Sequence, residues 1–249
     1  MKLKLGGSTS MSKLVSVLSE DFMEKNLGLK VEHSETGSGA AVNEVLNHTI
    51  DLGNISRNLN PDENPERFEK RIIAFDGIAL VVNVKNPVEN LSSSQIKSLF
   101  NGHVKNWSEL LNFDAPVTVV GREESSGTRK GFQSAFSLGS EVSYNVEYPE
   151  SGDIIARVGS DEGAIGYVSL ASVSGKTKSV KVDDAACNRE NIISGGYPVV
   201  RPFLQIFLKD FENVLFKKWF EFVNSEDGRT IINQENFIPA VDVEGSNDG

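Results

Sequence analysis

The sequence is poor in the side chains that build disulfide frameworks and metal centres. Of its 249 residues, one is cysteine and three are histidine. Cys187 alone cannot form an internal disulfide, and one thiol is too few for a thiolate cluster around a metal. His33, His48 and His103 lack the spacing of paired metal ligands, so we interpret them as ordinary surface or core residues. We therefore predict no metal site and no cofactor.

Long apolar runs are also lacking. The longest, residues 78–82, is far shorter than the roughly 20 residues that a bilayer-spanning helix needs, so no membrane helix is predicted. The first ten residues, MKLKLGGSTS, show no basic region, apolar core and cleavage site of a secretory signal. We expect that a targeting segment was either never present or has been removed.

The sequence has fewer positively charged than negatively charged residues, 25 against 35. The formal net charge is −10, and no stripe of lysine and arginine stands out along the chain. This balance argues against nucleic acid as a partner. It also argues against long-range attraction of small anions, so an anion would have to be bound by local donors in a confined site. The 39% of apolar residues suffices for the packed cores of one or two domains.

What the sequence does contain is one pattern, repeated three times. A short strand-like stretch is followed by a loop of glycine, serine and threonine, and then by apolar residues at helical spacing. The three loops cover residues 6–10, 36–39 and 121–129. Strands that alternate with helices predict parallel βαβ units, whose ligands bind beyond the carboxyl ends of the strands. We therefore predict an α/β fold with all three loops at such ends.

The rest of the chain shows further elements of the same kind. We expect strands at 78–84 and 164–168, helices at 94–100, 107–111 and 211–223, loop or edge structure at 173–191, and a frayed tail at 245–249. The helix that starts near residue 211 is expected to end around Asp227 and Gly228.

Two turn signals divide the chain. Asn86-Pro87 and Tyr197-Pro198 are candidate crossovers between lobes. They predict a discontinuous lobe I, residues 1–84 plus 199–249, and an inserted lobe II, residues 85–198, with hinge strands near 83–87 and 196–200. We expect capture of a ligand between the two lobes.

The three loops suit an anion. A helix N-terminus presents unpaired N–H groups and a partial positive charge, and hydroxyl groups add neutral donors. The alternative is that Ser10, Ser38 and Ser126 are plain N-caps. Three equivalent loops favour binding over capping.

Among the residues of the three loops, Arg122 best distinguishes an anion-binding loop from a plain helix cap. Its guanidinium fork fits a tetrahedral oxyanion, and Glu124 is placed to orient that fork. Arg129 lies inside the following helix, where we interpret it as a solvated residue or as an ion-pair partner across the lobes.

These residues resemble a known family. Residues 122–129, REESSGTR, are similar to the R-x-x-x-S-G-T signature of the PstS family, the phosphate-binding proteins of phosphate ABC importers. Residues 7–10 and 36–39 resemble the family's other two phosphate loops. The likeness covers nearly the whole chain and includes residues 76–83, 96–110, 165–168 and 197–202.

The resemblance implies a two-lobed periplasmic-binding-protein type II fold, in which each lobe is a mixed, mostly parallel sheet flanked by helices and the ligand cleft lies between the lobes. It implies a non-enzymatic, monomeric receptor that captures inorganic phosphate and delivers it to the membrane permease of an ABC transporter. The implied location is extracytoplasmic, in the periplasm or at the cell surface, with a lipid anchor on a removed N-terminal segment left open. By the same resemblance, the phosphate ligands are Thr9, Ser10, Ser38, Arg122, Ser126, Thr128 and the N–H of Gly127.

One position departs from the family. Members with an Ala-Ser-Asp sequence after the second strand use that aspartate to accept the proton of hydrogen phosphate, whereas this chain has Ile55-Ser56-Arg57. Arg57 cannot accept a proton, so either another carboxylate serves or anion discrimination is weaker. Asp76 is the candidate acceptor, because Gly77 after it indicates a close approach of the chain; a turn residue that caps the strand is the alternative. Arg57 itself either donates to the anion or bridges the lobes.

Three other functions compete. A receptor for another tetrahedral oxyanion, sulfate or molybdate, would use the same fold. A phosphate-handling enzyme would need a nucleophile with a base or a two-metal site, and the sequence has neither a G-x-S-x-G elbow nor a P-loop. An adhesion or structural protein would keep the fold without using Arg122.

Overall fold

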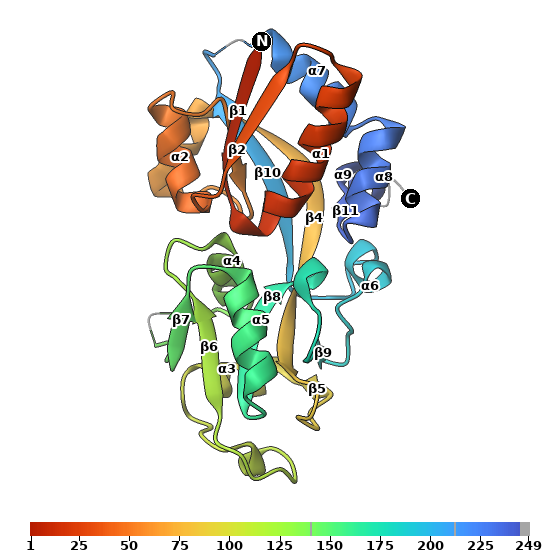
Figure 1. Ribbon diagram of the computed structural model, residues 1–249. Coiled ribbons are helices and arrows are strands. Elements are labelled where there is room, and N and C mark those ends of the chain that lie inside the picture. Colours follow the sequence, from red (N-terminus) through yellow and green to blue (C-terminus); the bar gives the residue numbers. More distant parts are fainter. Residues whose placement is uncertain (140, 212, 245–249) are drawn as a thin grey trace. The chain divides into compact units, whose positions relative to one another are not determined.

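The chain passes twice between two structural units. In the computed structural model, Met1–Asp76 and Arg201–Gly249 make up the first unit, and Gly77–Val200 make up the second. The structure describes residues 1–139, 141–211 and 213–244 (Figure 1). The tail predicted at 245–249 lies outside these described residues.

The first unit is built on a mixed sheet with strand order β2-β1-β3-β10-β4. Strand β1 (Lys2–Gly7) pairs in parallel with β2 (Lys30–Ser34) and β3 (Leu52–Ile55). Strand β10 (Val200–Leu208) runs antiparallel to β3. The alternation at the start of the chain is that of a half-buried strand, since Leu3 and Leu5 are buried and Lys2 and Lys4 are exposed.

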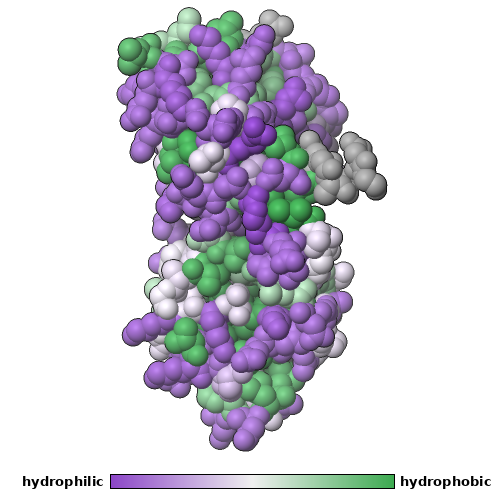
Figure 2. All heavy atoms as spheres, turned by 90° about the vertical axis from the view of Figure 1, so that its right-hand side faces the viewer, coloured by the Kyte–Doolittle hydropathy of each residue, from purple (hydrophilic) through white to green (hydrophobic). Residues whose placement is uncertain are grey.

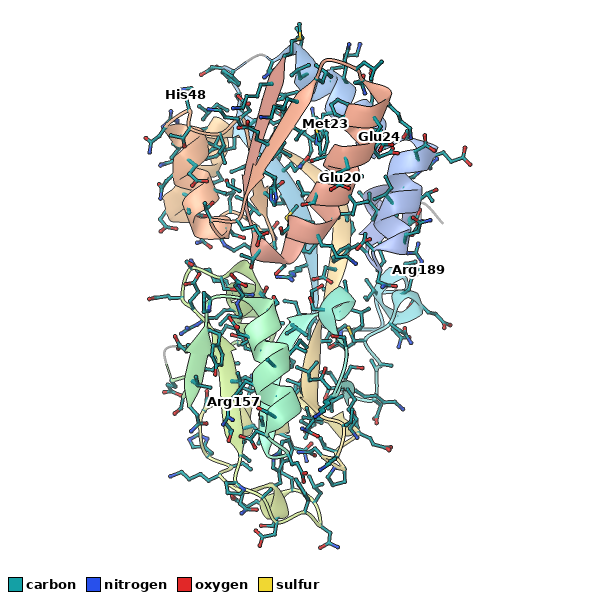
Figure 3. The ribbon with its side chains drawn as sticks, viewed as in Figure 1. Glu20, Met23, Glu24, His48, Arg157 and Arg189 are labelled. Atoms are coloured by element: carbon teal, nitrogen blue, oxygen red, sulfur yellow. The ribbon has the colours of Figure 1, made fainter. Side chains whose placement is uncertain are left out.

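Helices complete the first unit. These are α1 (Ser12–Lys25), α2 (Ser38–Leu46), α7 (Val214–Val223), α8 (Glu226–Gln234) and α9 (Ala240–Glu244), with the short strand β11 (Ile238–Pro239) paired to β4. Figure 1 shows α1 lying along β2, and the sulfur of Met23 in α1 accepts a hydrogen bond from the N–H of Val31 at 3.2 Å (Figure 3). Leu14, Leu18 and Phe22 recur at helical spacing on the buried face of α1.

The second unit has its own mixed sheet. Strand β4 (Phe68–Asn83) pairs antiparallel with β8 (Ala164–Ser169) and β9 (Thr177–Val182), and β6 (Thr118–Arg122) pairs in parallel with β8 and β7 (Val146–Tyr148). Strand β5 (Asn90–Leu91) pairs with β9. Residues 78–83 are buried without interruption, as expected for a strand covered on both faces.

The described residues of the second unit form the helices α3 (Ser93–Phe100), α4 (Gly127–Ala135), α5 (Ser151–Ser160) and α6 (Arg189–Ile193). Its core contains an aromatic cluster in which the rings of Phe132 and Tyr167 stack at 4.2 Å between centroids. Phe100 packs on both rings, so α3, α4 and β8 are joined through three side chains.

Short 3₁₀ turns link these elements. They lie at Thr9–Met11, Pro61–Glu63, Pro65–Arg67, Trp107–Glu109 and Leu170–Ser172. The brief helix predicted at 107–111 is the fourth of these turns.

The predicted α/β class with flanking helices is confirmed, but one boundary is wrong. The helix α7 ends at Val223, and Asp227 and Gly228 lie inside the next helix, α8. Ser225 starts α8, because its hydroxyl accepts a hydrogen bond from the N–H of Gly228 at 3.2 Å. A Cβ on Gly228 would lie 2.4 Å from the carbonyl oxygens of Phe222 and Val223. The glycine therefore permits close packing of two helices and does not end one.

Two surface properties follow from the composition. No helix among the described residues has the length and apolar character to span a membrane. Figure 2 shows that hydrophilic side chains predominate on the visible face of the first unit, in line with the 24% of charged residues.

Candidate functional site

Three serine hydroxyls meet in the first unit. Ser8 donates to Ser56 at 2.9 Å between hydroxyl oxygens, and the hydroxyl oxygens of Ser38 and Ser56 are 3.2 Å apart. The backbone N–H of Ser56 also donates to Ser38 at 3.2 Å. All three side chains are buried. We call Ser8, Ser38 and Ser56, together with Thr9 and Ser10, the first-unit cluster.

Backbone bonds bring two of the predicted loops together in this cluster. The carbonyl oxygen of Gly7, at the end of β1, accepts from the N–H of Thr36 at 3.1 Å and of Gly37 at 2.8 Å. Gly7 has φ of +132°, and a Cβ there would lie 2.3 Å from the carbonyl oxygen of Asn54. Only glycine fits this position. The loops after β1 and before α2 therefore lie side by side at the carboxyl end of β1.

Simple capping does not account for the serines of the first unit. Helix α2 has Gly37 as its N-cap and begins at Ser38, while α1 has Met11 as its N-cap. Thr9 and Ser10 lie in a 3₁₀ turn and are half-buried. Neither Ser10 nor Ser38 is thus an N-cap residue.

The third loop forms a second group, in the second unit. Arg122 ends β6, Ser126 precedes α4, and Gly127 and Thr128 are its first residues. All four are buried. We call them the second-unit cluster. Ser126 does cap α4, since its hydroxyl accepts from the N–H of Arg129 at 3.3 Å. For this serine, the capping prediction is confirmed.

The guanidinium of Arg122 is held by a segment that the sequence analysis missed. Its Nη1 donates to the hydroxyl of Ser151 at 3.0 Å, and its Nη2 donates to the carbonyl oxygen of Pro149 at 2.6 Å. Both acceptors lie at the start of α5. Glu124 is exposed at the turn, and its orienting role stays a prediction. The sequence signal for Ser151 was the Pro-Glu-Ser-Gly stretch before a helical pattern.

The interpretation of Arg129 as a solvated or interlobe residue was wrong. Its Nη1 donates to the carbonyl oxygen of Arg122 at 2.8 Å and pairs with Glu147 of the same unit at 2.9 Å. Its guanidinium carbon lies 4.8 Å from the ring centroid of Tyr144. With 16% of its side chain exposed, Arg129 braces the loop that carries Arg122.

Two tyrosines support the same loop from the core. The hydroxyl of Tyr167 accepts from the backbone N–H of Arg122 at 3.2 Å and lies 3.0 Å from the hydroxyl of Tyr144. Burial raises the pKa of Tyr167 well above its usual value, and burial also raises the pKa of Tyr144. Both phenols are therefore protonated at neutral pH and act as neutral hydrogen-bonding groups.

Arg57 and Asp76, for which the sequence left two roles open, each have an ion-pair partner within the first unit. Arg57 pairs with Glu63, with 2.6 Å between Nη2 and Oε1. Asp76 Oδ2 accepts from Nε and Nη2 of Arg201 at 3.0 and 2.7 Å, and both side chains are buried. Burial lowers the pKa of Arg201, and Asp76 opposes that shift.

Gly77 lies against side chains of its own unit. A Cβ at this position would lie 2.7 Å from both Cys187 Sγ and Ile192 Cδ1. The approaching groups are side chains of the second unit, so the glycine by itself gives no support to a ligand at Asp76.

Each cluster is rich in donors. The first-unit cluster offers hydroxyls and the first N–H groups of α2, and the second-unit cluster offers hydroxyls, a buried guanidinium and the first N–H groups of α4. Donors of these kinds suit a small anion. Residues 1–139, 141–211 and 213–244 contain no group of three or more His, Cys, Asp or Glu side chains that could hold a metal ion.

Comparison with known proteins defines the class. Residues 1–227 match the model of the PBP superfamily domain, so the chain belongs to the PBP superfamily.

Individual relatives within that superfamily are similar along most of their length. The Phosphate-binding protein PstS of Bacillus subtilis is 27% identical over 250 residues, which cover 99% of this chain and 83% of the relative. A Clostridium perfringens protein named as a phosphate ABC transporter substrate-binding protein, solved with bound phosphate, is 33% identical with a TM-score of 0.92 and covers 96% of this chain and 100% of its own. An ABC-type phosphate transport receptor from Vibrio cholerae is 28% identical with a TM-score of 0.81, covering 95% of this chain and 99% of its own. The resemblance inferred from the three loops is confirmed.

Proposed function

We propose that this protein is a solute-binding protein that captures inorganic phosphate and delivers it to the permease of an ABC importer. The observation that carries the proposal is the pair of donor clusters, one in each unit and largely buried, on a chain whose relatives are phosphate-binding proteins. Both clusters supply donors to phosphate: Thr9, Ser10 and Ser38 from the first unit, and Arg122, Ser126, Thr128 and the N–H of Gly127 from the second.

Hydrogen bonds suit this ligand better than net charge does. The chain carries a formal charge of −10, so phosphate gains little from the field of the whole protein. Arg122 is 3% exposed and is fixed by Ser151 and Pro149, so its charge acts at short range. A rigid donor set also keeps the ordering cost of binding low.

Arg57 and Asp76 complete the proposed site in different roles. Arg57 is a donor. Asp76 is the proposed acceptor that selects protonated phosphate over fully ionised sulfate, because only a protonated anion can donate a hydrogen bond to a carboxylate. Glu124 at the turn after Arg122 orients that residue.

The proposed receptor is a monomer outside the cytoplasm, at the periplasm or the cell surface, and has no enzymatic activity. Support for a binding role comes from the relatives, which are named as binding proteins and receptors. The hinge between units is proposed near residues 83–87 and 196–200.

Isothermal titration with phosphate, sulfate and molybdate tests the ligand. We expect phosphate to bind most tightly, and Arg122→Ala and Ser126→Ala each to weaken its Kd by about tenfold or more, about 1.4 kcal/mol. Tighter binding of sulfate than of phosphate at pH 8 would reject the assignment, and unchanged constants in both variants would reduce the third loop to a helix cap. Incubation with a chromogenic phosphomonoester tests the absence of turnover.

A further inference from the structure

The guanidinium of Arg57 is buried and only partly hydrogen-bonded. Its side chain is 4% exposed. Nη1 donates to the carbonyl oxygen of Asn58 at 2.9 Å and to Glu63 Oε2 at 2.8 Å, and Nη2 donates to Glu63 Oε1 at 2.6 Å. A guanidinium has five N–H donors. These contacts use both hydrogens of Nη1 and one of Nη2.

The donors that remain lie on one edge of the group. Nε is buried and has no hydrogen-bond partner in the part of the chain that the structure describes. The second hydrogen of Nη2 points the same way as Nε–H, because the guanidinium is planar. Together they form a side-on fork of two parallel donors, the geometry that binds two oxygens of an oxyanion. Leaving a buried charged donor unpaired costs free energy, so a ligand oxygen at this edge would stabilise the protein.

Arg57 is the next residue in the chain after Ser56 of the first-unit cluster. The hydroxyl of Ser56 bonds with Ser8 and lies 3.2 Å from that of Ser38. All of these residues follow the carboxyl ends of β1 and β3 or begin α2. The side chains of the cluster are neutral hydroxyls, and Arg57 is the guanidinium that follows them in the sequence.

Glu63 fixes the direction of the fork. Its two oxygens take the end-on edge of Arg57, and Oε2 also accepts from the backbone N–H of Asn60 at 2.7 Å. That bond is part of a capping box at Pro61–Glu63, so the carboxylate is tied to the backbone. Glu63 also cancels most of the charge of Arg57. What remains for a ligand is a pair of directed donors.

We propose that Glu63 is a positioning residue that fixes Arg57 so that the Nε–Nη2 edge binds two unprotonated oxygens of a tetrahedral dianion. This inference rests on the proposed function and specifies the ligand class for its first-unit half. Hydrogen phosphate and sulfate both present two such oxygens, so this edge grips the anion without distinguishing between them. Selection between the two anions is left to another group, for which Asp76 is the candidate.

Titration calorimetry with phosphate on the full chain tests the inference. Arg57→Met removes the fork, and Arg57→Lys keeps the charge but has no planar edge. We expect each to weaken the phosphate Kd by about tenfold or more, about 1.4 kcal/mol, with the same fold-loss for sulfate. Arg71→Met is the matched control, because Arg71 is a half-exposed arginine of the same unit.

Glu63→Gln separates positioning from electrostatics by the sign of its effect. Removing a negative charge near a bound anion should tighten binding if charge alone mattered. If Glu63 fixes the fork, the variant should instead weaken phosphate binding by about threefold or more, that is by at least about 0.7 kcal/mol. Glu69→Gln, at a more exposed carboxylate, should leave the Kd unchanged and serves as its control.

The outcomes are distinct. If the wild-type chain binds no phosphate, the proposed function itself fails. If it binds phosphate but Arg57→Lys and Arg57→Met stay within twofold of it, the fork is not a ligand and the inference fails while the function stands. Tighter binding by Glu63→Gln would overturn the positioning role. Thermal melting of each variant shows whether it is folded, and Glu63→Gln still decides the question if Arg57→Met does not fold.

Discussion

The guanidinium of Arg129 donates to the backbone carbonyl oxygen of Arg122, with 2.8 Å between Nη1 and O. One arginine of the third loop thus supports the other, and the support comes from the first turn of the helix that Ser126 caps. The loop is fixed from both of its ends, which is the condition for a binding group that keeps its geometry before the ligand arrives.

Arg129→Met tests this support. The variant loses a charge-assisted hydrogen bond and the pair with Glu147, so we expect a loss of about 1–2 kcal/mol in unfolding free energy and a several-fold weaker phosphate Kd. Urea denaturation and calorimetry measure the two effects. Arg157→Met is the control, because Arg157 of α5 (Figure 3) pairs with Asp161, the residue that directly follows this helix. Equal losses in both variants would show that Arg129 has no special role.

Tyr167→Phe removes a buried acceptor. The ring and its stacking on Phe132 remain, but the N–H of Arg122 loses the hydroxyl that it bonds. We expect the unfolding free energy to fall by about 1–3 kcal/mol, as measured by urea denaturation. Tyr144→Phe deletes the bond between the two hydroxyls and the side-chain bond with Gln133, but it leaves the N–H of Arg122 bonded to Tyr167 and should cost less. A larger loss in Tyr144→Phe than in Tyr167→Phe would contradict this ranking.

Asp76→Asn breaks a buried ion pair. Arg201 would keep a buried charge without its carboxylate partner, so we expect a loss of about 3–5 kcal/mol in stability. Glu162→Gln breaks the exposed pair with Lys85 and should cost less than about 1 kcal/mol. The same Asp76 variant tests the acceptor role, since the preference for phosphate over sulfate should shrink. If stability falls and the preference does not change, Asp76 is a structural residue only.

His33 should make stability depend on pH. Burial lowers its pKa in the folded state, Glu35 opposes that shift, and Nε2 has no hydrogen-bond partner among the described residues. The unfolded state, with a pKa of about 6.5, therefore binds the proton first as the pH falls. The contribution is present above that pH and is lost as the pH falls through the lower folded value. Denaturation midpoints between pH 7 and 5 should fall less in His33→Gln than in the wild type, while exposed His103→Gln should follow the wild type.

Local patterns in the sequence predicted the elements and the three loops well. Gly7 and the alternation of Leu3 and Leu5 report directly on backbone conformation and burial, which are local properties. The helix end predicted at Gly228 was wrong, because a glycine that ends a helix and a glycine that lets two helices pack closely cannot be told apart in a sequence.

The residues that support Arg122 and Arg57 could not be predicted from local sequence patterns. Ser151, Tyr167 and Glu63 act through partners that the fold brings to them, over separations of 29 and 45 residues for the first two. Glu63 was close enough in sequence to Arg57 to be found, six residues away. No periodicity marks such a pair, however, since Arg57 lies in a loop and Glu63 in a single 3₁₀ turn.

A crystal structure of the protein grown with phosphate tests the central claim most directly. We predict density for one tetrahedral anion within hydrogen-bonding distance of the Ser38 hydroxyl in the first unit and of Arg122 and the Ser126 hydroxyl in the second. Density for an anion that touches neither cluster, or no bound anion at saturating phosphate, would contradict the account.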